Sequence, residues 1–269
     1  MHGCVRCPAS PVHRLSIPEL DCPIKTGSLN PAGFSGFYCD GIFRQCRKAS
    51  VRSNMGRPQK PETNSPSQSQ IFLIRHGKPE FPYTNEPGKW IWGREFNRLS
   101  KLYDESSLNH SWNRNRLENH APDLLERIKS SRPISSDIRR ATQTASLVLG
   151  ENRDVDTHEL FREVPLPTVP EFLKLPAYWH LILARLLWYA GKQSDEPRSA
   201  ARDRASRAAD FLESHEGSGS VCLFSHGFFL YLLTHELIHR GWLCEETRPM
   251  RYLEIRSFSR PGSEGLKAI

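Results

Sequence analysis

Three short apolar segments, at residues 71–74, 133–134 and 221–224, recur at wide intervals along this chain of 269 residues. They are too short for helices and lack the alternation of a half-exposed strand, which predicts strands buried on both faces. Helical patterns follow the second segment at residues 139–149 and the third at residues 228–240. Strands that alternate with helices predict an α/β domain, a three-layer sandwich with a mainly parallel central sheet.

The remaining segments complete this outline. Residues 155–161 are expected to form a further strand, and the alternating residues 251–258 are expected to form an edge strand. Residues 79–92 are aromatic and rich in proline, and residues 165–176 are expected to be irregular. The other helices, which are charged or amphipathic, are expected at one segment that ends near Lys129, at residues 178–190 and at residues 197–216.

Order is expected to begin abruptly at Ile71. Residues 1–68 are rich in Pro, Ser, Gly and Cys without a sustained period, which predicts a disordered extension before a domain at residues 69–260 and a tail at residues 261–269. Met55 stands just before a polar linker, so a start at this methionine stays open as an alternative. The first 60 residues hold six of the seven net positive charges. Because the domain itself is nearly neutral, no nucleic-acid partner is expected.

The cysteines are concentrated in the same extension, which holds five of the seven. A secreted disulfide framework would place them throughout the core, so a reducing, cytoplasmic location is expected. Cys4 and Cys7 have zinc-like spacing but lack the second close pair of a zinc ribbon. The longest apolar stretch, residues 178–190, is shorter than the roughly 20 residues that span a bilayer, so no membrane partner is expected.

Polar and basic motifs stand directly after the three apolar segments. Arg75-His76-Gly77 follows the first, residues 135–140 follow the second, and Ser225-His226-Gly227 follows the third. The carboxyl ends of parallel strands meet at one edge of a sheet, where helix N-termini also favour anions. Arginine makes bidentate bonds to phosphate, and nearby arginines keep an imidazole neutral and able to attack phosphorus. Gly77 and Gly227 are expected to leave room for a phosphate beside the backbone.

In this order and placement the motifs resemble those of the histidine phosphatase superfamily, which includes the phosphoglycerate mutases. The middle motif, Ser136-Asp137-Ile138-Arg139-Arg140-Ala141-Thr142-Gln143-Thr144-Ala145, matches the family pattern Ser-x-x-x-Arg-Ala-x-x-Thr-Ala. The resemblance covers about residues 70–258. It implies a phosphoglycerate mutase-like fold and a phosphatase of the histidine acid phosphatase type. Such an enzyme hydrolyses a small phosphomonoester through a phosphohistidine, with no metal and no cofactor.

The resemblance also implies a role for each pocket residue. His76 would be the phosphorylated nucleophile, and His226 would donate a hydrogen bond to the phosphate. Arg75 and Arg140 would clamp the phosphoryl oxygens next to Gly77. The motif selects Arg140 rather than its neighbour because Arg140 directly precedes the alanine.

Many members of the family carry an acidic residue that protonates the leaving oxygen, in the loop after the third strand. Glu163 is the best match, and Glu159 and Glu171 stay open as alternatives. Lys78 and Pro79 depart from the acidic residue and Thr or Ser that many members have after Arg-His-Gly, which weakens the case for a phosphoglycerate mutase-like phosphotransferase.

Two further functions are weighed against a phosphatase. His235-Glu236-Leu237-Ile238-His239 matches the zinc-protease pattern His-Glu-x-x-His, in which both histidines bind zinc and the glutamate acts as base. A phosphate-binding module that kept the fold and lost turnover is the other alternative. All the central pocket residues are present, so the sequence favours the enzyme. It specifies neither the substrate nor the oligomeric state.

Overall fold

The computed structural model of the protein describes residues 69–192 and 194–261. The predicted extension at residues 1–68, the alternative start at Met55 and the Cys4–Cys7 pair lie outside the described residues. So does the predicted tail, apart from its first residue. The domain bounds of 69–260 stay a prediction. Among the described residues, no helix combines the length and apolar character needed to cross a membrane.

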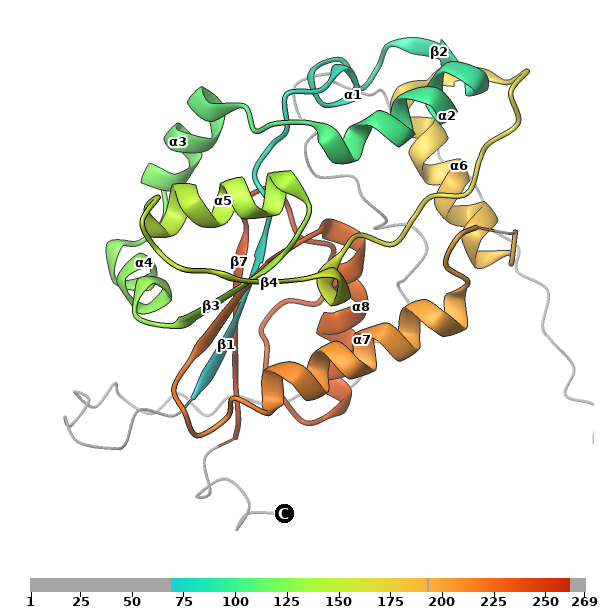
Figure 1. The fold of residues 1–269 in the computed structure, drawn as a ribbon. Coiled ribbons are helices and arrows are strands. Elements are labelled where there is room, and N and C mark those ends of the chain that lie inside the picture. The colour runs from blue at the N-terminus through green and yellow to red at the C-terminus, as the bar shows by residue number, and fades with distance from the viewer. Residues whose placement is uncertain (1–68, 193, 262–269) are drawn as a thin grey trace, which may run out of the picture. The chain divides into compact units, whose positions relative to one another are not determined.

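A five-stranded sheet forms the centre of the described part of the chain (Figure 1). Its strands are β1 (Gln70–Arg75), β3 (Arg132–Ser136), β4 (Asp156–His158), β6 (Val221–Ser225) and β7 (Ile255–Ser259). The order is β4-β3-β6-β1-β7, with parallel pairing throughout except for β7, which is antiparallel to β1 at one edge. The prediction of a mainly parallel sheet is confirmed.

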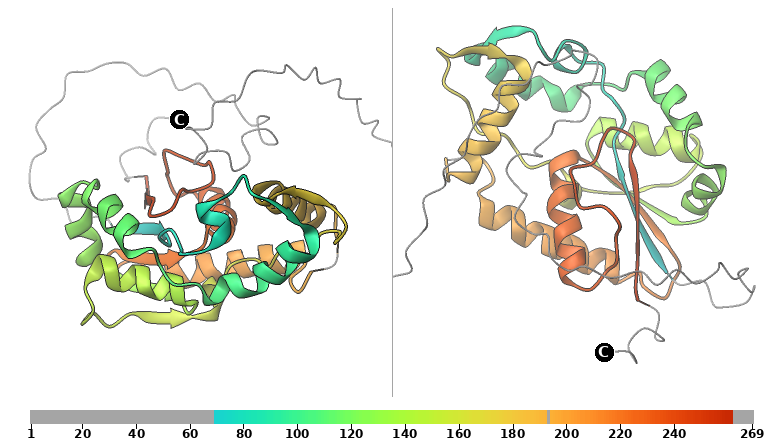
Figure 2. Two further views of the ribbon diagram at one scale, coloured as in Figure 1. Left: turned by 90° about the horizontal axis from the view of Figure 1, so that it is seen from above. Right: turned by 180° about the vertical axis from the view of Figure 1, so that it is seen from behind.

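Alternate residues of β1 pack against different helices, which explains why its sequence is continuously apolar. Ile71 and Leu73 belong to the core beneath two helices, and Phe72 and Ile74 belong to the core beneath two others. The first pair is α7 (Arg198–Glu213) and α8 (Gly227–His239), and the second is α4 (Pro122–Lys129) and α5 (Arg139–Leu149). Seen from behind, α8 and α5 lie on opposite sides of the strands (Figure 2). The predicted three-layer sandwich is therefore confirmed.

Cys222 of β6 is part of this packing. The sequence predicts a small buried hydrophobe, and the side chain is indeed fully buried. Burial raises the pKa of its thiol to about 12, so the reactive thiolate is suppressed.

A second, smaller core lies in a lid that the sequence only partly predicts. The lid contains α1 (Pro82–Asn85), β2 (Trp90–Trp92), α2 (Gly93–Leu102) with the 3₁₀ turn Tyr103–Glu105 that follows it, β5 (Lys174–Pro176) and α6 (Ala177–Tyr189). β2 pairs antiparallel with β5, so the aromatic, proline-rich segment at residues 79–92 and the segment expected to be irregular at residues 165–176 meet in a small sheet. Phe81, Ile91 and Phe96 are buried between these elements.

Two local expectations are wrong. The single charged helix expected to end near Lys129 is three helices, because Asn109 caps a separate α3 (His110–Glu118) and Pro122 begins α4. The strand expected at residues 155–161 ends at His158. A 3₁₀ turn at Glu159–Phe161 follows it and directs the Phe161 side chain into the core.

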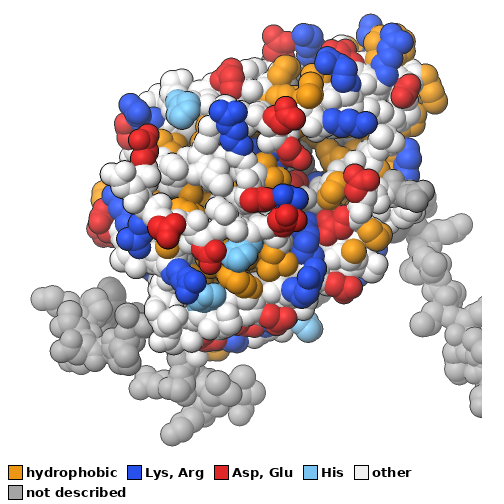
Figure 3. Space-filling model, in the orientation of Figure 1, with side chains coloured by type: hydrophobic (Ala, Val, Ile, Leu, Met, Phe, Trp, Pro, Cys, Tyr) orange, Lys and Arg blue, Asp and Glu red, His pale blue; other side chains and the backbone are white. Residues whose placement is uncertain are grey.

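On the face of the molecule turned toward the viewer in Figure 3, the described basic and acidic side chains are intermixed. A nearly neutral domain with mixed surface charge offers no broad basic track on this face.

Candidate active site

The sheet order brings the three motifs together at one edge. β6 lies between β1 and β3, and all three run in the same direction. His76 follows β1, and its backbone amide donates to the carbonyl of Ser225 at 2.8 Å. Ser225 ends β6, so this bond joins the first and last motifs directly. α5 and α8 begin just beyond this edge, at Arg139 and Gly227.

His76 is buried and held in one tautomer. Its Nδ1 lies 2.7 Å from the carbonyl oxygen of Gly77, which can only accept, so Nδ1 carries the proton. The opposite nitrogen, Nε2, accepts from Arg140 Nε at 3.3 Å. Burial first, and then the charges of Arg140 and Arg75, hold the pKa of His76 well below its ordinary value, against the opposing pull of the Gly77 carbonyl. The ring is thus neutral with a lone pair on Nε2.

Arg140 lies in the first turn of α5 and is fully buried, whereas its neighbour Arg139 is exposed. Its Nη1 donates to the Asp104 carboxylate at 2.8 Å and to the Tyr103 carbonyl at 3.2 Å. Its Nη2 is buried and has no hydrogen-bond partner among the described residues.

Arg75 lies against the start of α8. Its Nη1 donates to the carbonyl of Met250 at 2.6 Å, while its Nε is buried and unpartnered within the described residues. A Cβ at Gly227 would stand 2.8 Å from the guanidinium carbon of Arg75, so any larger residue there would displace the Arg75 side chain.

The two motif glycines therefore make room for protein side chains. At Gly77 an added Cβ would stand 2.4 Å from Oδ1 of Asn113, a buried side chain that also bonds the backbone of Lys78. The expectation that both glycines also leave room for a phosphate beside the backbone stays a prediction. Gly77 keeps one further link to the site, because its amide donates to the Thr144 hydroxyl at 2.9 Å.

His226 faces His76 from the start of α8, with 5.1 Å between the two ring centroids. Its Nε2 and the Ser136 hydroxyl are hydrogen-bonded at 2.9 Å, and its Nδ1 has no partner among the described residues. Burial above all, then the charge of Arg140, holds the pKa of His226 well below its ordinary value.

These contacts leave three buried polar atoms without partners, one each on Arg75, Arg140 and His226. Leaving such an atom unsatisfied costs about 1–3 kcal/mol, and more where the group is charged. All three belong to residues grouped around His76. An anion with several oxygen acceptors would satisfy them and oppose the arginine charge, so the arrangement is suited to binding phosphate.

Glu163 lies at the first turn of α8. Its carboxylate accepts from the backbone amides of Val164 and Phe229 at 2.9 Å and of Phe228 at 3.2 Å. The two alternative acids differ in placement. Glu159 is exposed and paired with Arg162, and Glu171 is exposed in the lid. Of the three acids, Glu163 is the one that accepts hydrogen bonds from the first turn of α8, the helix capped by His226.

Sequence reasoning missed several neighbours of the pocket. Thr144 stood inside the quoted motif, one helical turn after Arg140, whose carbonyl accepts its hydroxyl at 2.6 Å. The one-turn spacing from Arg140 within the motif was the sequence signal that could have identified Thr144. Tyr103 and Asp104, which contact Arg140, and Tyr252, whose ring centroid lies 5.6 Å from that of His76, carry no motif.

The residues of the zinc-protease pattern have other contacts. The Glu236 carboxylate accepts from Arg240 Nε at 2.8 Å, and the His235 ring packs edge-on against Tyr231 at 4.5 Å. Within residues 69–192 and 194–261, no three His, Cys, Asp or Glu side chains are grouped to hold a metal ion.

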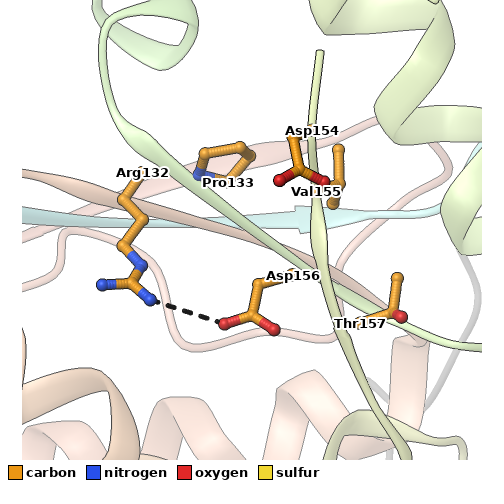
Figure 4. Close-up of a pocket in the computed structure, with 6 residues that line it drawn as sticks. All are labelled: Arg132, Pro133, Asp154, Val155, Asp156 and Thr157. Carbon is orange, nitrogen blue, oxygen red and sulfur yellow. Dashed lines mark ion pairs between the residues drawn. The ribbon is translucent and has the colours of Figure 1, made fainter.

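A pocket of about 480 Å³ lies at the opposite ends of β3 and β4, near their first residues (Figure 4). An ion pair between Arg132 and Asp156 at 3.5 Å spans it. None of the motif residues lines this pocket, so it is separate from the histidine pair.

Comparison with known proteins decides the family. The model of the histidine phosphatase superfamily, branch 1, matches residues 71–255. The chain belongs to the histidine phosphatase superfamily. Its match contains all three motifs. A search of curated proteins finds no significant match.

Among solved structures, this superfamily member is similar to the product of an open reading frame of Mycobacterium tuberculosis. The two share 19% identity with a TM-score of 0.50, covering 72% of this chain and 93% of the other. A mycobacterial glucosyl-3-phosphoglycerate phosphatase shares 20% identity with a TM-score of 0.42, covering 70% and 92%. Phosphoserine phosphatase from Entamoeba histolytica, as an H9A mutant, shares 15% with a TM-score of 0.43, covering 68% and 94%. At these identities the likeness concerns the fold.

The two adjacent arginines of α5 provide a matched test of the pocket. In the full chain, Arg140→Ala is expected to weaken orthovanadate binding by about 10- to 100-fold, because a charge-assisted bond to the anion is lost. Arg139→Ala is expected to change it by less than about twofold, since that side chain is exposed. Calorimetric titration measures both constants, with Arg140→Lys as a variant that keeps the charge. Equal losses from Arg139→Ala and Arg140→Ala would contradict the placement of Arg140 at the anion.

Proposed function

We propose that this member of the histidine phosphatase superfamily is a phosphatase that hydrolyses small phosphomonoesters through a phosphohistidine on His76. The strongest support is one arrangement: a buried neutral imidazole whose Nε2 faces Arg140, next to three unpartnered polar atoms. Neutral imidazole is a competent nucleophile, and the surrounding donors match phosphoryl oxygens. The two arginines supply positive charge that a metal ion supplies in other phosphatases, so the proposed reaction is independent of metal.

In the first step, the lone pair of His76 Nε2 forms a bond to phosphorus as the bond to the leaving oxygen breaks. Glu163, entering this step in its protonated form, gives its proton to the leaving oxygen, so the alcohol departs neutral. Arg75 and Arg140 stabilise the charge on the equatorial oxygens, and His226 donates a further hydrogen bond. The product of this step is phospho-His76 beside a Glu163 carboxylate.

In the second step, water attacks the phosphorus of phospho-His76. The Glu163 carboxylate accepts a proton from that water as the phosphorus–nitrogen bond breaks. Inorganic phosphate leaves, His76 returns to the neutral state, and Glu163 is protonated for the next cycle. The Glu163 carboxylate accepts from the amide of Phe228, two residues after His226, and this position at the first turn of α8 supports its use in both steps.

We also propose a cytoplasmic setting, in which a small soluble phosphomonoester is the partner and nucleic acid is not. The described cysteines, Cys222 and Cys244, are both free, which suits a reducing compartment. Surface charges that alternate in sign over the face in Figure 3 suit a small substrate rather than a polyanion.

Two histidine variants separate this proposal from the zinc-protease alternative. In the full chain, His76→Ala is expected to lower kcat for an aryl phosphate by at least about 1,000-fold, because the nucleophile is removed. His239→Ala, at an exposed helix end, is expected to leave activity within about twofold. Orthovanadate should inhibit the wild type and EDTA should not, and circular dichroism should show the same fold in all three proteins. Near-normal turnover by His76→Ala, or loss of activity with His239→Ala and EDTA, would contradict the proposal.

The acid role of Glu163 is tested through the leaving group. With an alkyl phosphate, Glu163→Gln is expected to lower kcat by about 100- to 10,000-fold, the usual value of a positioned acid. With a nitrophenyl phosphate the loss should be smaller, because that leaving oxygen needs less protonation. Glu159→Gln is the control and should lower neither rate. Equal losses on the two substrates, or a loss with Glu159→Gln instead, would contradict this assignment.

A further inference from the structure

Each of the two pocket arginines is stacked on a tyrosine outside the three motifs. The guanidinium carbon of Arg75 lies 4.2 Å from the ring centroid of Tyr252, and that of Arg140 lies 4.5 Å from the ring centroid of Tyr103. These distances are within the range of cation–π contacts, which are strongest where water is excluded. Stacking fixes the plane of a guanidinium and therefore the direction in which its N–H groups point.

The Tyr252 contact completes a slot for Arg75. The guanidinium lies against the backbone of Gly227, where an added Cβ would come within 2.8 Å of its carbon, and it also lies over the Tyr252 ring. The Met250 carbonyl fixes the end of the side chain at 2.6 Å. These contacts limit the movement of the side chain, whose Nε is buried and has no partner among the described residues.

Arg140 is held in a similar way by the lid. The Tyr103 ring covers its face, while the Tyr103 carbonyl and the Asp104 carboxylate accept from Nη1. These contacts leave Nε facing His76 and Nη2 unpartnered. The Tyr103 ring itself packs edge-on against Phe81 of the lid core at 5.2 Å.

The two tyrosines are joined to each other. Their hydroxyl oxygens are hydrogen-bonded at 3.4 Å, although the residues are 149 positions apart in the sequence. Burial first, and then Tyr252, hold the pKa of Tyr103 well above its ordinary value, so its phenol keeps the proton that such a bond requires. The bond connects the lid with the loop that precedes β7.

The backbone next to Tyr252 is strained. Leu253 has a φ of 54°, a left-handed conformation that is uncommon for residues with a side chain, and it is fully buried. Its carbonyl lies 2.8 Å from His120 Nε2, and its amide donates to the His76 carbonyl at 3.4 Å. Strain of this kind persists where surrounding contacts fix the chain, and it is common at functional sites.

We propose that Tyr103 and Tyr252 are positioning residues. Tyr103 holds the plane of the Arg140 guanidinium and Tyr252 holds that of Arg75. The hydrogen bond between the two tyrosine hydroxyls, called the lock below, couples the two arginines beside His76. This inference rests on the proposed function, because it assigns the two tyrosines to the same phosphate clamp. The proposal links the position of the lid to phosphate binding. If the lid moved away from the sheet, Tyr103 would move with it. The bond between the two hydroxyls would then break, and the guanidinium plane of Arg140 would no longer be held.

Phenylalanine and leucine variants of the full chain separate the two parts of the proposal. Tyr103→Leu and Tyr252→Leu remove the stacked ring and are expected to raise the inhibition constant of inorganic phosphate by roughly tenfold. Tyr103→Phe and Tyr252→Phe keep the ring, so phosphate inhibition should stay within about twofold. Each should lower kcat/KM for an aryl phosphate by about threefold through loss of the lock. Tyr178→Phe in α6 is the control and should change neither value.

The double variant Tyr103→Phe/Tyr252→Phe tests the lock itself. Both single variants break the same bond, so the double variant is expected to lose no more kcat/KM than either single variant. Losses that multiply would overturn the lock, and leucine variants with unchanged phosphate inhibition would overturn the positioning role.

Calorimetric titration with phosphate repeats the comparison without turnover. Wild-type protein that binds phosphate but hydrolyses nothing would contradict the phosphatase proposal, and the affinities of the leucine variants would still decide the role of the tyrosines. Leucine variants with wild-type phosphate affinity in that titration would overturn the inference.

Discussion

Positive charge buried beside a histidine is the constraint on which this site depends. Arg140 is fully buried, and Asp104, its carboxylate partner among the described residues, lies largely in solvent. A buried guanidinium is costly unless an opposite charge is near. The same charge, added to burial, holds the pKa of His76 low and keeps its Nε2 unprotonated. One arrangement therefore supports both the proposed anionic ligand and the proposed role of His76 as nucleophile.

The rest of the structure maintains that arrangement. β6 lies between β1 and β3, so His226 follows the strand next to that of His76, and Arg140 lies in the helix that follows the strand beyond it. Apolar residues on both faces of these strands fix the sheet between two helix layers. Gly227 admits Arg75 against the start of α8, and Thr144 ties Gly77 to the helix that carries Arg140. The lid adds the contacts to Arg140 that the sheet does not provide.

Local patterns allowed the sheet and the motif residues to be predicted. A continuous apolar run indicates a strand covered on both faces, and the alanine after Arg140 distinguishes it from exposed Arg139. The structure of the lid was harder to predict, because the short strand at residues 90–92 pairs with a strand more than 80 residues later in the sequence. Tyr252 had no local signal either. Its importance comes from Tyr103, 149 positions away, and from a strained backbone that no pattern of residue types encodes.

A covalent intermediate is the central claim, and trapping it is the most direct test. Wild-type full-length protein is mixed with a ³²P-labelled phosphomonoester, quenched within one turnover and digested, and the labelled peptide is sequenced by mass spectrometry. The account predicts an acid-labile, alkali-stable label on His76 that forms at least as fast as turnover. Steady hydrolysis without any label, or with the label on another residue, would contradict it.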